Sequence, residues 1–314
     1  MSLRLLHYSD VENAYDDPGR IGRLAGALDG LDGEDALVVG TGDNTSPGVL
    51  ALATEGRQAL DFFAAVDPDV ATFGNHDFDY GPEAARGIVA DSPQTWVTAN
   101  VCADGERFAA GETRRTALVE VDGTRVGFTG VTTPRTASLS PQATPLTFTD
   151  PVAAAADAVA DLRARGVDHV VVLSHLGGGD DELAEAIDAD VVLGGHVPTG
   201  RIDRVDGTLV TRPGDGGEAI VEVDLGAGTA TRHETGDAPR DEAVARALDD
   251  RMSAAGLDEI IATVDDPLVR TEETLFGGES RVGNFVADAY RWATGADVAL
   301  QNSGGIRSGA PVEG

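Results

Sequence analysis

The chain has 314 residues, of which 41% are hydrophobic, so it is long enough for one large domain or two unequal ones. It carries 54 acidic and 23 basic residues, a formal net charge of −31, and every basic residue is Arg. So acidic a surface disfavours nucleic acid and anionic membranes as partners. The single Cys102 excludes an internal disulfide and a thiolate metal cage.

The acidic residues are spread from Asp29 to Asp266 rather than gathered in one tail. Two explanations compete for this charge: a binding protein that repels phosphate, or a protein adapted to multimolar salt, where screening relieves self-repulsion. The even spread favours salt adaptation, and the composition resembles that of proteins from extreme halophiles. No stretch approaches the roughly 20 apolar residues of a membrane span, and the N-terminus lacks signal-peptide features. We therefore expect a cytoplasmic protein.

Short apolar runs alternate with longer helical patterns in the first part of the chain, which is typical of α/β domains. Strands are predicted at 3–8, 36–39, 70–73, 126–131, 167–173 and 190–193. Helices are predicted between them, including an Ala-rich helix over 151–165. From 201 to 233 the pattern changes to antiparallel hairpins with Asp-Gly and Gly-Ala-Gly turns. We therefore predict one α/β domain over 1–235.

The rest of the chain is expected to form two further parts. Residues 236–257 have helical spacing and are predicted to form a linker helix. Residues 258–314 contain a predicted helix at 284–294 and a strand at 298–300, followed by NSGGIRSG. This last segment is short for an independent domain. We interpret it as the beginning of a second, incomplete α/β domain.

Metal-competent side chains follow five of the predicted strands, in short and mostly glycine-containing motifs. The motifs are Ser9-Asp10-Val11-Glu12-Asn13, Gly40-Thr41-Gly42-Asp43-Asn44, Gly74-Asn75-His76-Asp77-Phe78-Asp79, Ser174-His175-Leu176-Gly177 and Gly194-Gly195-His196-Val197-Pro198. Ligands of open α/β sheets bind beyond the carboxyl ends of the strands, and glycine lets the backbone turn sharply there. Asp, Asn and His form a mixed oxygen and nitrogen donor set that suits Mn²⁺, Zn²⁺, Fe or Co²⁺. Two such ions can share a hydroxide for in-line attack on a phosphate.

The order of these motifs resembles that of the calcineurin-like metallophosphoesterases. The spelling GNHDFDYG, together with NSGGIR near the end of the chain, is similar to the 5′-nucleotidase branch of that family. The resemblance covers nearly the whole chain. It implies a four-layer α/β sandwich over 1–235 and the start of a nucleotide-binding domain over 258–314. It also implies two divalent metal ions and a small phosphoester or nucleotide as substrate.

The resemblance also implies a role for each metal-competent residue. Asp43 would bridge both metals, Asp10 would belong to the first site, and Asn75, His175 and His196 would complete the second. His76 would not be a ligand but a cation close to the phosphate. Asp79 would orient His76 and keep it protonated.

Two positions depart from the family pattern, and both fall in the first metal site. The family's D-x-H is Asp10-x-Glu12 here, and the residue two after His196 is Pro198, which has no ligating side chain. Glu12 can still donate oxygen. We therefore expect the first site to be harder and weaker, with a preference for Mn²⁺ or Mg²⁺ or only partial occupancy.

In the C-terminal segment, Asn302 and Arg307 match the Asn and Arg of the family's NGGGIR segment, where Arg suits bidentate phosphate binding. The family's Arg before Glu279 is replaced by Gly278. Arg281 is the candidate to compensate, although an ordinary surface role is the more common fate of such a residue.

The sequence leaves three functions open. The leading one is a phosphomonoesterase of the 5′-nucleotidase type that uses a metal-bound hydroxide. The alternatives are a phosphodiesterase acting on 2′,3′-cyclic nucleotides or sugar nucleotides, and a degenerate metal-binding protein without turnover. Outside the motifs, Asp180 and Asp181 are interpreted as solvated residues or helix N-caps, and His7 is given no role.

Overall fold

The computed structural model describes residues 3–260, 263–306 and 309–312. The chain divides into two compact units, the first ending at Leu257 and the second beginning at Asp258. Within the described residues, no helix is long and apolar enough to span a membrane.

The first unit is built on two six-stranded sheets. The first sheet has the spatial order β15 (Thr229–Glu234), β14 (Ala219–Asp224), β1 (Arg4–Tyr8), β2 (Ala36–Thr41), β3 (Val70–Thr72) and β4 (Thr95–Trp96). The second has the order β12 (Arg201–Val205), β13 (Thr208–Arg212), β11 (Val191–Gly194), β10 (His169–His175), β8 (Thr124–Thr132) and β7 (Thr116–Val121). Strands β1 to β4 are parallel, as are β8, β10, β11 and β13, and the antiparallel pairings lie toward the sheet edges.

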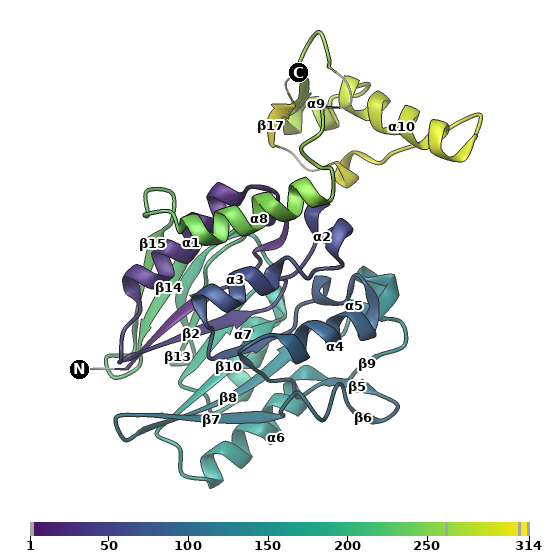
Figure 1. Ribbon diagram of the computed structural model, residues 1–314. Coiled ribbons are helices and arrows are strands. Elements are labelled where there is room, and N and C mark those ends of the chain that lie inside the picture. Colours follow the sequence, from purple (N-terminus) through teal and green to yellow (C-terminus); the bar gives the residue numbers. More distant parts are fainter. Residues whose placement is uncertain (1–2, 261–262, 307–308, 313–314) are drawn as a thin grey trace. The chain divides into compact units, whose positions relative to one another are not determined.

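The two sheets pack face to face, with helices on their outer sides (Figure 1). Successive side chains of β1 point to opposite faces: Leu5 belongs to the apolar cluster between the sheets, whereas Leu6 packs toward the helices. The helices of the first sheet include α1 (Pro18–Leu31) and α3 (Ala59–Val66), and those of the second include α6 (Pro151–Ala164) and α7 (Asp180–Ala186). This arrangement confirms the predicted four-layer α/β sandwich.

Helix α8 (Glu242–Ala254) covers the stretch that the sequence assigns to a linker. Its N-cap Asp241 accepts hydrogen bonds from the backbone of Ala243 and Val244. Val244 and Leu248 are buried in the same apolar cluster as α1, because they fall on one helical face. The helix therefore packs on the first unit, which extends to Leu257.

The second unit has few buried side chains. It contains β16 (Leu268–Arg270), α9 (Glu272–Phe276), α10 (Arg281–Thr294) and β17 (Gly309–Val312), and β16 pairs with β17. Its described core consists of Leu268, Leu275 and Val282, with Ile306 packed against it.

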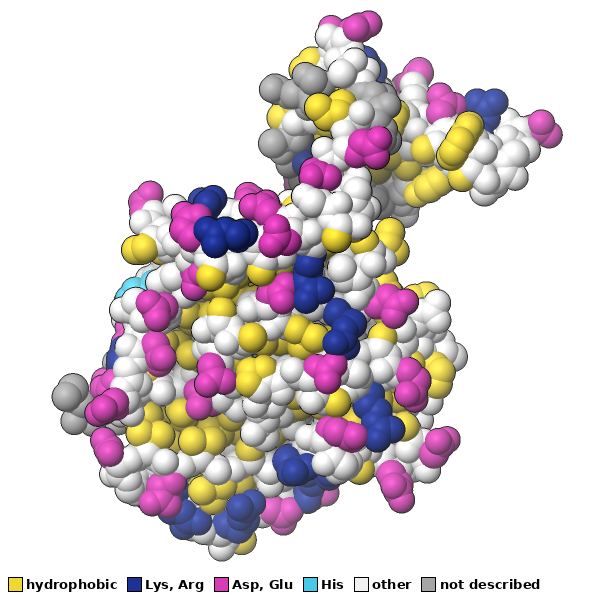
Figure 2. All heavy atoms as spheres, viewed as in Figure 1, with side chains coloured by type: hydrophobic (Ala, Val, Ile, Leu, Met, Phe, Trp, Pro, Cys, Tyr) yellow, Lys and Arg dark blue, Asp and Glu magenta, His cyan; other side chains and the backbone are white. Residues whose placement is uncertain are grey.

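Figure 2 shows one face of the molecule, on which Asp and Glu side chains are scattered rather than clustered.

Candidate metal centre

The five motif loops meet at one edge of the facing sheets, at the carboxyl ends of β1, β2, β3, β10 and β11. Two glycines allow this approach. A Cβ on Gly42, which has a φ of 90°, would lie 2.2 Å from the backbone nitrogen of Gly74. A Cβ on Gly195 would lie 2.5 Å from Ser9 Oγ and 2.8 Å from His175 Nδ1. Only glycine therefore lets these loops converge.

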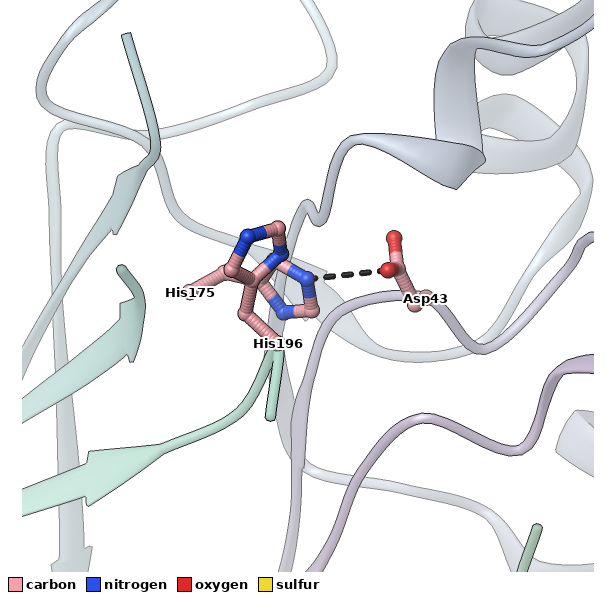
Figure 3. Close-up of side chains that lie close together, drawn as sticks. All are labelled: Asp43, His175 and His196. Atoms are coloured by element: carbon pink, nitrogen blue, oxygen red, sulfur yellow. Dashed lines mark hydrogen bonds and ion pairs between the residues drawn. The ribbon is translucent and has the colours of Figure 1, made fainter. Parts of the chain in front are cut away.

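Asp43 lies at the centre of the site. Its φ is 52°, and its buried carboxylate accepts a hydrogen bond from the backbone of His76 at 2.7 Å. The other carboxylate oxygen lies 3.0 Å from His175 Nε2 (Figure 3). His175 Nδ1 donates to the carbonyl of Thr41 at 2.7 Å. That second bond fixes the ring and directs Nε2 toward the carboxylate, as is usual for metal-binding histidines.

The His196 ring lies beside that of His175, with 5.1 Å between the ring centroids (Figure 3). Burial lowers the pKa of His175, but the charges of Asp43 and Asp10 outweigh it and raise the pKa to about 10. Burial and the charge of His175 lower the pKa of His196 to about 4, which keeps that ring neutral and able to bind a cation. Burial raises the pKa of Asp43, yet His175 brings it below its ordinary value.

Among the described residues, two groups of donor atoms could each hold a metal ion, and Asp43 belongs to both. The first is Asp43, His175 and His196, and the second is Glu12, Asp43 and His76; within each group the ligand atoms lie within 4.8 Å of one another. Asn75 supports the same interpretation, because its Oδ1 is buried and accepts no hydrogen bond from the part of the chain that the structure describes. A buried acceptor without a donor is costly unless something binds it. The donor set therefore fits divalent metals.

The loop after β1 brings Asp10 and Glu12 to the centre, both at positive φ, 50° and 49°. The carboxylate of Asp10 accepts hydrogen bonds from the hydroxyl of Ser9 and from the backbone of His196, the latter at 3.0 and 3.1 Å. Burial raises the pKa of Asp10 to about 8, helped by the charges of Asp43 and Glu12. A cation bound beside Asp10 would lower this pKa and keep the carboxylate ionised.

His76 and Asp79 form the predicted pair. His76 Nδ1 lies 2.8 Å from Asp79 Oδ2, and Asp79 also accepts from the hydroxyls of Ser46 and Ser140, at 3.0 and 2.5 Å. Burial lowers the pKa of His76, but Asp79 and Asp43 raise it to about 9, so the ring is a cation at neutral pH. The structure also puts His76 within reach of Glu12 and Asp43, which the resemblance does not imply.

Asp77 is a site residue to which the sequence pattern alone gives no role. Its buried carboxylate accepts from the backbone nitrogens of Asp43, Asn44 and Gly74 and from the hydroxyl of Thr45, at 2.7 to 3.2 Å. It therefore ties the loop after β2 to the loop after β3. Only its position in the GNHD motif could have indicated this role, because a sequence does not show which backbone nitrogens will donate to a side chain.

The interpretation of Asp180 and Asp181 as solvated residues or helix N-caps agrees with Asp181 but is wrong for Asp180, because the N-cap of α7 is Gly179. Asp180 is fully buried and pairs with Arg212 at 2.7 Å, whereas Asp181 is exposed and pairs with Arg201. Asp180 also accepts from the hydroxyl of Ser174, the residue before His175, at 2.7 Å. Arg212 donates to the carbonyl of Gly177 at 3.0 Å. This ion pair braces the loop that carries His175.

His7 is likewise buried, with its two ring nitrogens 2.8 and 3.2 Å from the hydroxyls of Thr41 and Thr211. Burial lowers its pKa to about 3, so the ring is neutral. It bridges β1, β2 and β13 beneath the metal centre.

The predicted substrate-binding residues belong to the second unit. Asn302 is exposed at the start of a short 3₁₀ turn, where its side chain accepts from Gln301 at 3.0 Å. Arg281 is exposed and pairs with Asp266 at 3.2 Å. Arg307 lies outside the described residues. Their role in binding substrate stays a prediction.

Comparison with known proteins agrees with this geometry. Residues 3–200 match the family profile described as calcineurin-like phosphoesterase, and residues 260–314 match that of the 5′-nucleotidase C-terminal domain. The first match covers more than half of the chain, so the chain belongs to the calcineurin-like phosphoesterases, a family of metal-using phosphoester hydrolases. The second match is to a profile named for the 5′-nucleotidases and is confined to the second unit.

Individual proteins that are similar in sequence include a nucleotide phosphoesterase and a 5′-nucleotidase. The chain is 24% identical to the trifunctional nucleotide phosphoesterase protein YfkN of Bacillus subtilis, with 98% of this chain and 25% of YfkN aligned. It is 27% identical to a 5′-nucleotidase of Diplobatis ommata, over 63% of this chain and 37% of that protein. The crystal structure of a 5′-nucleotidase precursor from Thermus thermophilus superposes with a TM-score of 0.80 at 26% identity, covering all of this chain and 72% of that one. The chain thus spans well under half the length of these two curated relatives.

Proposed function

We propose that this chain is a phosphomonoesterase of the 5′-nucleotidase type, which removes phosphate from nucleotides or related esters with the help of two divalent metal ions. The observation that carries the proposal is the position of Asp43 in both groups of converging donor atoms. A carboxylate shared by two such groups suits a pair of neighbouring metals. The unsatisfied Oδ1 of Asn75 supports the same assignment.

Each residue then has a distinct task. Asn75, His175, His196 and Asp43 would hold one metal. Glu12 and Asp43 of the second group, together with Asp10, would hold the other, whereas His76 of that group would not be a ligand. When bound, metals such as Mn²⁺, Zn²⁺, Fe or Co²⁺ supply Lewis acidity and activate water. His76, kept cationic by Asp79, would stabilise the charge that develops on the phosphoryl group and its leaving oxygen.

Glu12 stands where the family has a histidine, and Pro198 offers no side-chain ligand. The metal next to Asp10 and Glu12 would therefore be bound mainly by carboxylate oxygens, which favour Mn²⁺ or Mg²⁺. We propose that this position is the weaker of the two and is only partly filled at low metal concentration.

Hydrolysis assays test the activity. The protein, stripped with a chelator and reloaded with Mn²⁺ in high KCl, is given p-nitrophenyl phosphate, bis-p-nitrophenyl phosphate and nucleoside 5′-monophosphates. We expect metal-dependent release of phosphate from the monoesters. Faster cleavage of the bis ester would favour a phosphodiesterase instead. Absence of turnover with metal bound would favour the binding protein without catalysis.

We also propose that the net charge of −31 is an adaptation to high salt. Self-repulsion between the acidic side chains is relieved when salt screens them. The protein should then lose tertiary structure at low ionic strength and regain it in molar KCl. Near-UV circular dichroism across a salt series measures this. Equal stability in dilute buffer would contradict the adaptation.

A further inference from the structure

A cavity of about 310 Å³ lies in the first unit, close to the metal centre. Its lining includes Pro134, Val152 and Leu176, which are apolar, and one cationic side chain, that of Arg135. Leu176 directly follows His175, and the next residue, Gly177, is so close to His196 that a Cβ on it would lie 2.9 Å from the ring carbon Cδ2. The wall of the cavity is therefore part of the loop that carries a proposed metal ligand.

The segment 133–140 that carries Arg135 is attached to the site at both of its ends. The backbone nitrogen of Thr133 donates to the carbonyl of His175 at 3.1 Å. At the other end, the hydroxyl of Ser140 donates to the carbonyl of Asn75 at 2.8 Å and to Asp79. These bonds hold the backbone of Arg135 in a fixed relation to the metal and dyad loops.

The guanidinium of Arg135 is exposed and has no ion-pair or hydrogen-bond partner among residues 3–260, 263–306 and 309–312. Most of the described Arg side chains in this acidic chain do pair with a carboxylate or a carbonyl, as Arg212 does with Asp180. Two carboxylates, Asp150 and Glu182, line the same cavity, but neither pairs with Arg135, and Asp150 accepts from the backbone of Ala153 instead. Because these two carboxylates repel anions, an anionic group of a ligand in the cavity would have to lie against Arg135.

We infer that this cavity is a subsite for the leaving group of the substrate, and that Arg135 binds a second anionic group there. Substrates whose leaving group carries a phosphate, such as nucleoside diphosphates, would then be preferred over monophosphates. This inference rests on the proposed function. In the reaction, water adds a hydroxyl to the terminal phosphorus, the bond from that phosphorus to the bridging oxygen breaks, and the bridging oxygen keeps the electron pair. The products are inorganic phosphate and a nucleoside monophosphate that takes up the remaining proton.

The matched substrates are adenosine 5′-diphosphate and adenosine 5′-monophosphate, because their leaving groups differ by one phosphate. With the Mn²⁺-loaded full chain, Arg135→Gln should raise KM for the diphosphate about 10- to 100-fold, the usual worth of a hydrogen-bonded charge contact. The kcat should change little, because the contact is present in both ground state and transition state. The monophosphate and p-nitrophenyl phosphate should be affected about twofold or less. Arg135→Lys, which keeps the charge, should restore part of the loss.

Arg246→Gln is the control, since Arg246 is also exposed and lies on α8, outside the site. In high KCl the Debye length falls to about 3 Å, so a distant charge has little effect on a bound anion. The Arg246→Gln variant should therefore have the KM and kcat of the wild type on all substrates. A direct contact between Arg135 and the substrate is not screened in this way. An equal loss on both nucleotides, or no loss on the diphosphate, would overturn the inference.

Binding of a methylene-bridged diphosphate analogue, measured by calorimetry, separates the two proposals. Analogue binding that depends on Arg135, in a protein without turnover, would contradict the proposed function and support this subsite. Turnover of monoesters without any dependence on Arg135 would support the function and overturn the subsite.

Discussion

The two sides of the metal centre are held in different ways. The histidine side is formed by Asn75, His175 and His196. Its two histidines lie at the ends of β10 and β11, and a hydrogen bond to the carbonyl of Thr41 fixes the ring of His175. The carboxylate side, Asp10 and Glu12, comes from a single loop after β1, with both residues at positive φ. Asp43 joins the two sides. Orientation set by strands and hydrogen bonds lowers the entropy cost of binding, so we expect the histidine side to bind metal more tightly.

The largest expected effect concerns His76, which lies within reach of the carboxylate side although it is proposed as a cation rather than a ligand. His76→Asn should lower kcat about 10²- to 10⁴-fold, the usual worth of a positioned acid or charge stabiliser, with metal content intact. His196→Asn should lower metal content and activity together. Steady-state kinetics with elemental analysis measure both. Parallel loss of metal in His76→Asn would move His76 into the ligand set of the carboxylate side.

A smaller effect is expected from the ion pair that braces the histidine side. Asp180→Asn should weaken metal binding about 10- to 100-fold, as loss of a group supporting a ligand usually does. It should also destabilise the fold by about 3–5 kcal/mol, because Arg212 loses its buried partner. Asp181→Asn is the matched control: its pair with Arg201 is exposed, and such pairs contribute about 0–1 kcal/mol. Metal titration and urea unfolding measure the difference. Identical behaviour of the two variants would contradict the bracing role.

The smallest effect is a shift in pH dependence. Because the pKa of His76 is raised to about 9, the ring carries its charge at neutral pH and loses it as the pH rises through that value. Asp79→Asn removes a hydrogen bond that raises this pKa, so the basic limb of the kcat profile should move to lower pH. A profile measured from pH 6 to 10 shows the shift. An unmoved basic limb would mean that another group controls it.

The contrast between the two sides also explains what the sequence could predict. Strand-end motifs such as those of Asp43 and His175 are local patterns, and parallel strands bring their carboxyl ends to one edge, so the convergence of these residues follows from the pattern. The buried role of Asp180 does not, because its partner Arg212 lies 32 residues away and an acidic run alone is typical of a solvated surface. The role of Asp77 could not be predicted for a related reason, since three of its four hydrogen-bond donors are backbone nitrogens.

The second unit shows a further limit of predicting structure from this sequence. Its sequence pattern predicts a helix at 284–294, and α10 spans Arg281–Thr294. The predicted strand at 298–300 is not a strand in the structure, where these residues are exposed or half-buried without regular structure. Val298 and Leu300 are 73% and 89% exposed, so an apolar run that is typical of a buried strand has no described partner strand here.

The central claim is that Asp43 joins two metal positions of unequal strength. Calorimetric titration of metal-free protein with Mn²⁺, checked by elemental analysis, tests it most directly on three proteins. The wild type should bind two ions with different affinities. Glu12→Ala should keep the tighter one, and Asp43→Ala should bind neither. An Asp43→Ala protein with the stoichiometry of the wild type would contradict the account.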